Sequence, residues 1–263
     1  MPALHHFSLS MGNPLLIPPL HPFPWVGKSP CLGFPVPFPM SCSSCQCRGL
    51  SSLAKKAIMA VTGLILVGFV AGHMSGNLLY FKGPEALDAY AKWLHGLGPA
   101  LWIARVVLLA AAAAHIWAGI SLAAENRAAR AGGPAVEATR RASVASRTMP
   151  YTGVVLLGFI VFHLLHFTFR TVGPEIAAAG DAGRVHEMIR LGFASPGVSV
   201  FYIVSMALLC LHLSHGVSSM FQTLGLRNER WRSRLDVLAA AYGWAIFLGF
   251  AAIPVHVLAT AAK

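Results

Sequence analysis

The sequence is poor in charged residues, and in acidic residues above all. Only 11% of its 263 residues are charged, and 9 acidic side chains stand against 20 Lys and Arg, whereas 56% of the residues are hydrophobic. Soluble domains carry about a quarter charged residues. The composition therefore excludes an ordinary soluble domain and predicts an integral membrane protein.

The net charge of +11 does not indicate a nucleic-acid partner. The basic residues gather at the ends of apolar runs, as the positive-inside rule predicts for a membrane protein. The cysteines do not form a disulfide framework either, because Cys210 lies within an apolar run and the other four precede the first run. Cys42, Cys45 and Cys47 could bind a soft metal, but no fourth ligand lies near them.

Residues 1–50 differ in composition from the rest of the chain. Their closely spaced prolines exclude a regular helix. No Lys or Arg precedes Lys28, so the segment lacks the basic start of a signal peptide. We expect a disordered leader without function, or a start codon assigned too early with Met40 and Met59 as alternatives, followed by a functional domain over 51–263.

Five apolar runs follow, and each is near the ~20 residues that a bilayer requires. They cover residues 57–81, 100–123, 150–170, 198–224 and 236–259. The sequence thus predicts an all-α membrane protein with five transmembrane helices.

The loops between these runs set the expected orientation. The basic residues concentrate before the first run and in the second and fourth loops, as Lys55, Lys56, Arg127, Arg130, Arg140, Arg141, Arg147, Arg227, Arg230, Arg232 and Arg234. We therefore expect these loops and the N-terminus in the cytoplasm and the C-terminus outside, in a bacterial-type cytoplasmic membrane. The outer loops 82–99 and 171–197 each contain a predicted amphipathic helix, EALDAYAKWLHGLG and GRVHEMIRLG, for the membrane surface.

The chain contains an internal repeat. Thr62 to His73 reads TGLILVGFVAGH, and Thr152 to His163 reads TGVVLLGFIVFH. The offset persists beyond the histidine, because the tripeptide at Gly83 returns at Gly173 as Gly-Pro-Glu. We interpret this as a duplicated two-helix hairpin with a fifth helix added.

The apolar runs hold histidines but no carboxylate in their interiors. The histidines are His73, His115, His163, His166, His212, His215 and His256. Ionisable groups at this depth are costly and are usually functional. A di-iron bundle site or a carboxylate proton relay would require buried acids. A haem with two axial histidines remains the natural candidate.

Depth along the helices pairs four of these histidines. At ~1.5 Å per residue, His73 and His163 lie about 10 to 13 Å from the outer helix ends, and His115 and His212 about 15 and 24 Å. The difference is small, so geometry alone leaves the pairing open. A shared His-x-x-x-Gly pattern at His115 and His212 supports the inner pair, because a flat macrocycle beside the ligand favours a residue without Cβ one turn along.

Other small residues precede the outer ligands, as Gly63, Gly68, Gly153 and Gly158, although glycine also serves helix packing in membranes. His166 and His215 lie three residues beyond a proposed ligand, where they could contact a propionate or a quinone or have a local partner. His256 has no counterpart in the repeat.

In combination, these motifs resemble a known family. The chain from about residue 50 to 260 is similar to the single-chain, di-haem cytochrome b558 membrane subunit of succinate:quinone oxidoreductases, which comprise succinate dehydrogenase and fumarate reductase. The resemblance is carried by Gly63 with His73, His115-x-x-x-Gly119, Thr152-Gly153 with His163, and FYIVSMALLCLHLSHG from Phe201 to Gly216.

The resemblance implies two b haems and a place in an electron-transport complex. His73 and His163 would hold an outer haem and His115 and His212 an inner one, in a four-helix bundle. It also implies a flavoprotein subunit with FAD and an iron–sulfur subunit on the cytoplasmic side, with quinone, most often menaquinone, reacting near one haem.

Further residues are candidates for roles at these sites. Gly119 and Gly216 are expected to pack against haem. Arg105 and Arg170 could neutralise haem propionates or serve as interface anchors. For the quinone site, the outer candidates are the polar side chains Glu85, Asp88 and His95.

Two alternatives stay open at this point. One is a b561-like di-haem electron carrier without a flavoprotein partner. The other is a haem-free membrane anchor or transporter whose histidines serve packing or proton relay.

Overall fold

The structure is a computed structural model that describes residues 50–130 and 144–261. The predicted leader, including Cys42, Cys45 and Cys47, and the loop residues Arg140 and Arg141 lie outside the described residues.

All regular elements in these ranges are helical, which confirms the predicted all-α fold. In chain order they are α1 (Ser52–Asn77), η1 (Leu78–Lys82), α2 (Pro84–Gly96), α3 (Pro99–Arg130), α4 (Val144–His163), η2 (Leu164–Thr168), α5 (Pro174–Asp181), α6 (Val185–Phe193), α7 (Pro196–Thr223) and α8 (Arg232–Ala261). η1 is a 3₁₀ turn that continues α1, and η2 is a π-helical turn that continues α4.

Five of these segments are long and apolar enough to cross a membrane: Ser52–Lys82, Pro99–Ala129, Thr148–Thr168, Pro196–Thr223 and Arg232–Ala261. The five predicted spans are therefore confirmed at this level. The helices extend beyond the predicted apolar runs at several ends, since charged first and last turns keep helical geometry that hydropathy does not detect.

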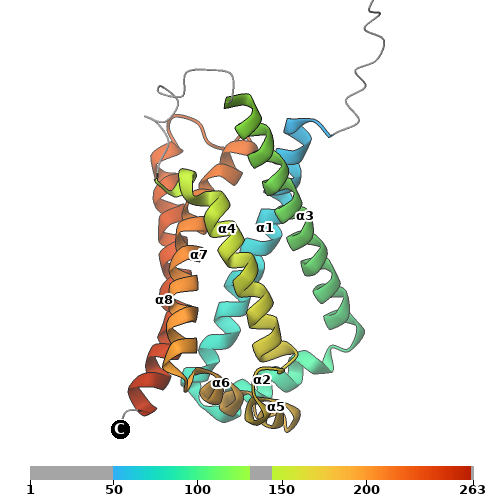
Figure 1. Cartoon of the computed structure of the whole chain (residues 1–263), viewed down its shortest axis with the longest axis vertical. Helices are drawn as coiled ribbons and strands as arrows, with labels where there is room; N and C mark the ends of the chain where they lie inside the picture. The colour runs from blue at the N-terminus through green and yellow to red at the C-terminus, as the bar shows by residue number, and fades with distance from the viewer. Residues whose placement is uncertain (1–49, 131–143, 262–263) are drawn as a thin grey trace, which may run out of the picture. The chain divides into compact units, whose positions relative to one another are not determined.

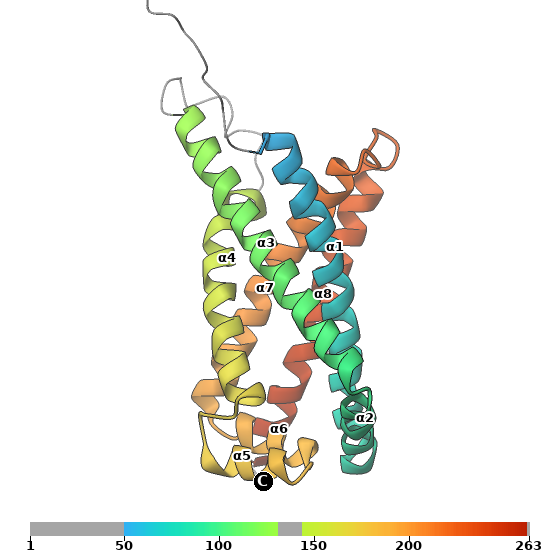
Figure 2. The same ribbon diagram turned by 90° about the vertical axis from the view of Figure 1, so that its right-hand side faces the viewer.

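The five long helices alternate in direction (Figures 1 and 2). The start of α1, the end of α3, the end of α7 and the start of α8 lie at one end, where Lys55 forms an ion pair with Glu125 and Arg227 with Asp236. We call this the basic end. The short helices α2, α5 and α6 lie at the opposite end, near the C-terminus (Figure 1).

Local sequence explains where the helices begin. The Ser51 hydroxyl accepts a hydrogen bond from the backbone N–H of Ala54, 3.2 Å away, and so caps α1. Proline stands at the first position of α2, α5 and α7, where a missing N–H costs nothing. The predicted amphipathic helices of the outer loops are present as α2 and α6, whereas α5 was not predicted.

Helices α7 and α8 form the most closely packed pair. A Cβ atom at Gly243 of α8 would lie 2.8 Å from the carbonyl oxygen of Cys210 in α7, so glycine permits this approach. The Tyr242 hydroxyl donates a hydrogen bond to the Val67 carbonyl, 2.6 Å away, and fixes α8 to α1. By contrast, only 11% of the span over α1 is buried within the polypeptide, against 33% for α7.

Candidate functional site

His73 of α1 and His163 of α4 face each other inside the helix bundle. Their ring centroids are 5.9 Å apart with an interplanar angle of 78°. Each ring stacks on a phenylalanine four residues earlier: Phe69 lies 5.3 Å from His73 and Phe159 lies 5.8 Å from His163. Since the two phenylalanines also correspond in the repeat, both copies present the histidine in the same way. We call His73 and His163 the outer pair.

His115 of α3 and His212 of α7 form a second facing pair. Their ring centroids are 6.4 Å apart and the rings are tilted by 60°. We call them the inner pair, because the residue that contacts His115 in α1 is Thr62, closer to the basic end than His73 by about 16 Å of helix. The two pairs therefore occupy two depths of the bundle.

The repeated threonines bind the inner pair. The Thr62 hydroxyl donates to the carbonyl oxygen of Ile58, 2.7 Å away, and its oxygen lies 3.3 Å from Nδ1 of His115. In the second copy, the Thr152 hydroxyl donates to the carbonyl of Met149, 3.1 Å away, and its oxygen lies 3.2 Å from Nδ1 of His212. Each threonine oxygen is thus within hydrogen-bonding distance of Nδ1 of one histidine of the inner pair.

The glycine after each threonine makes room for the same ring. A Cβ atom at Gly63 would lie 3.4 Å from Cε1 of His115, and one at Gly153 would lie 3.8 Å from Cε1 of His212. The predicted packing glycines have looser surroundings, since a Cβ atom at Gly119 or Gly216 would meet only a methionine methyl group at 3.8 or 4.0 Å. Of these four glycines, the two in the Thr-Gly repeat therefore lie nearest to the rings of the inner pair.

The geometry of both pairs suits one metal ion between two imidazoles. Two rings on opposite sides of a metal, with metal–nitrogen bonds of about 2 Å, have centroids roughly 6 Å apart whatever their rotation about the shared axis. Each of the four histidines keeps part of its surface exposed in the polypeptide. Among the described residues, no three His, Cys, Asp or Glu side chains gather around a metal position. Two nitrogen ligands per site fit a haem, whose macrocycle supplies the other four.

A tyrosine supports the outer pair from α7. The Tyr202 hydroxyl lies 3.4 Å from Nδ1 of His163 and 3.0 Å from Nδ1 of His166. His166 is 1% exposed and lies in the π-helical turn η2, against Phe167. His166 therefore has the local side-chain partner that the sequence left open. The Asn77 amide nitrogen donates to the His73 carbonyl at 2.8 Å and also lies 3.4 Å from Nδ1 of His73.

The two predicted propionate partners contact other groups. Arg105 is exposed on α3, and its guanidinium carbon lies 4.9 Å from the centre of the Trp102 ring. Arg170 forms an ion pair with Asp181 at 2.9 Å and has a φ of 56°, in the left-handed region. The role of these arginines toward a propionate stays a prediction.

The predicted quinone-site residues all lie on α2. Glu85 and His95 are exposed, and Nδ1 of His95 bonds the carbonyl of Ala91 at 2.8 Å. Asp88 accepts a hydrogen bond from the backbone N–H of His186 at 2.9 Å, in the first turn of α6. Asp88 thus caps α6, and the structure does not bring these three side chains to either histidine pair.

The remaining histidines contribute to the end opposite the basic end. His256 is exposed and meets Tyr80 and Phe81 edge-on, at 5.8 and 5.4 Å. The His186 ring stacks on the Tyr80 ring, with the two ring centroids 4.4 Å apart. His215, by contrast, is half-buried on α7.

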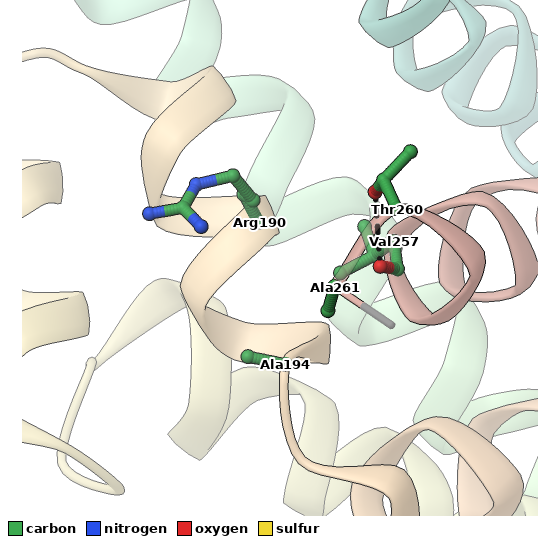
Figure 3. A pocket seen from close by; sticks show the side chains of 5 residues that line it. All are labelled: Arg190, Ala194, Val257, Thr260 and Ala261. Atoms are coloured by element: carbon green, nitrogen blue, oxygen red, sulfur yellow. Dashed lines mark hydrogen bonds between the residues drawn. The ribbon is translucent and has the colours of Figure 1, made fainter. Parts of the chain in front are cut away.

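A pocket of about 200 Å³ lies between α6 and the end of α8 (Figure 3). Its lining is Arg190, Ala194, Val257, Thr260 and Ala261, so none of the four paired histidines borders it. The Arg190 guanidinium pairs with Glu187 at 2.7 Å, and this hydrogen bond holds the pKa of the Glu187 carboxyl below its usual range. The one charged side chain of the pocket is therefore already neutralised.

Comparison of the chain with models of protein families, with curated protein sequences and with solved structures found no match.

Proposed function

We propose that this protein is the membrane-anchoring cytochrome b subunit of a succinate:quinone oxidoreductase, carrying electrons between an iron–sulfur subunit and a membrane quinone. The proposal is supported by two pairs of facing histidines on four helices long and apolar enough to span a membrane. The ring centroids are 5.9 Å apart in the outer pair and 6.4 Å apart in the inner pair.

The chain's own residues would hold two haem b groups. His73 and His163 would bind the iron of the outer haem, and His115 and His212 would bind that of the inner haem. Haem iron, when bound, provides reversible one-electron oxidation and reduction. The helices supply a dry interior in which neutral imidazole is an inexpensive ligand.

The basic end is suited to an acidic partner. Arg230, Arg232 and Arg234 are exposed there, as are Lys56 and Arg127. Clustered positive charge steers a negatively charged surface into contact. This supports docking of the iron–sulfur subunit, with its FAD-containing flavoprotein, from the cytoplasmic side.

The alternatives make different demands on the same residues. A b561-like carrier would use both histidine pairs but needs no flavoprotein partner. A haem-free anchor or transporter would not require the two histidines of either pair to face each other at these distances. We prefer the oxidoreductase subunit because the family-like spacing and the basic end agree with it.

An optical spectrum and a subunit inventory of the native complex test the proposal. We expect the reduced-minus-oxidised spectrum of bis-histidine b haem, at two haems per chain, together with flavin and iron–sulfur subunits. A spectrum without b haem would refute both haem functions. Two haems without flavoprotein or iron–sulfur protein would favour the b561-like carrier.

A further inference from the structure

Both inner histidines make the same contact with the threonine of a repeated Thr-Gly dipeptide, although they lie on different helices. Thr62 reaches from α1 to His115 on α3, and Thr152 reaches from α4 to His212 on α7. The contact occurs twice, in two copies of the repeat, so it is a feature of the site rather than of one helix pair.

The threonines determine which ring nitrogen carries the proton. The hydroxyl hydrogen of Thr62 is used by the Ile58 carbonyl, and that of Thr152 by the Met149 carbonyl. Each threonine can then only accept from Nδ1–H. The Nε2 atoms of His115 and His212 keep their lone pairs, which is the form that binds a metal.

We infer that Thr62 and Thr152 are positioning residues of the inner site: each holds its histidine in the Nδ1-protonated form and orients Nε2 for iron. This rests on the proposed haem-binding function. A ligating histidine that donates its other N–H becomes more basic, and its ring orientation is fixed. The inner haem should therefore have a lower reduction potential than it would without these hydroxyls, because a stronger nitrogen donor favours ferric iron.

The outer pair lacks this arrangement at one of its two ligands. His163 has the Tyr202 hydroxyl near Nδ1 at 3.4 Å, whereas the group near Nδ1 of His73 is the Asn77 amide nitrogen at 3.4 Å, which cannot accept a hydrogen bond. Loss of Thr62 or Thr152 should consequently change the reduction potential of the inner haem and leave that of the outer haem unchanged.

The test uses the full-length protein with Thr62→Val, Thr152→Val and Thr62→Ser, and Thr223→Val as the matched control. Thr223 makes the same kind of intrahelical bond, to the Ser219 carbonyl at 3.1 Å, on an exposed turn. Potentiometric titration should show both valine variants raising the potential of the same haem step. Haem should be retained about 10-fold less tightly. Thr62→Ser should restore both properties, and Thr223→Val should leave them unchanged.

A haem-free preparation gives a second readout. Nitrogen-15 spectra of labelled histidine should report Nδ1-protonated rings for His115 and His212, and each valine variant should lose that signature at its own histidine. Haem-loaded variants whose inner step stays at the wild-type potential, or in which both steps move together, would overturn this inference alone. A wild-type chain without haem would overturn the proposed function and the role toward haem with it.

Discussion

The Tyr202 hydroxyl lies 3.0 Å from Nδ1 of His166, a ring that is almost completely enclosed by protein. Removing this hydroxyl by Tyr202→Phe leaves a buried imidazole nitrogen without its partner. We expect a loss of about 1–3 kcal/mol in unfolding free energy. Thermal or denaturant unfolding of the detergent-solubilised protein measures it. Tyr151→Phe is the control, since Tyr151 is 70% exposed; equal stability of the two variants would contradict the assignment.

The pairing of the histidines predicts which single substitutions share a phenotype. His115→Ala and His212→Ala should abolish the same haem, because each removes one of two ligands from one site. His73→Ala and His163→Ala should abolish the other haem. Optical spectra recorded during a redox titration show which haem each variant still contains.

His95→Ala is the matched control for these substitutions, since His95 lies on the exposed side of α2 and bonds its own helix. It should keep both haems. Loss of different haems from the His115 and His212 variants would refute the pairing.

Alanine substitutions at the two glycines of the Thr-Gly repeat should have unequal effects on haem content. Alanine at Gly63 would press on the His115 ring from 3.4 Å, whereas alanine at Gly153 would have ordinary contact with His212 at 3.8 Å. We expect Gly63→Ala to reduce haem content and Gly153→Ala to retain it. In a helix, alanine itself is favoured over glycine by about 0.5–1 kcal/mol, so haem per chain is the measurement of choice. Equal haem content in both variants would show that the closer approach is relieved by movement of the helices.

The leader predicts a neutral deletion. Removing residues 2–48 should leave haem content and complex assembly unchanged, because the proposed ligands and helices all lie beyond it. Haem quantification and co-purification of partner subunits measure this. Impaired assembly would show that the leader participates in the complex.

The five spans were predictable because hydropathy and the ~20-residue requirement depend on the chain alone. The amphipathic helices α2 and α6 were also predictable from their pattern. Helix α5 was not predicted, although the Gly-Pro-Glu sequence at its start belongs to the repeat. A proline at a first helical position was the available signal.

The partners of side chains were harder to predict than the helices. Thr62 was visible as part of the repeat, yet its contact with His115 depends on how α1 and α3 are rotated about their axes. A hydropathy pattern does not define that rotation. Arg170 was expected as a propionate partner or an interface anchor, but it forms an ion pair with Asp181. Such contacts arise from tertiary packing between segments distant in sequence.

The uneven burial of the long helices has a consequence for biosynthesis. The chain's first two spans are made before α7 and α8, and the first has the smallest share of buried residues among the five candidate spans. During synthesis the faces of α1 that pack against α7 and α8 stay uncovered until that later pair is made. Under the proposed function, haem would cover part of the same interior, so cells starved of haem should accumulate less of the chain.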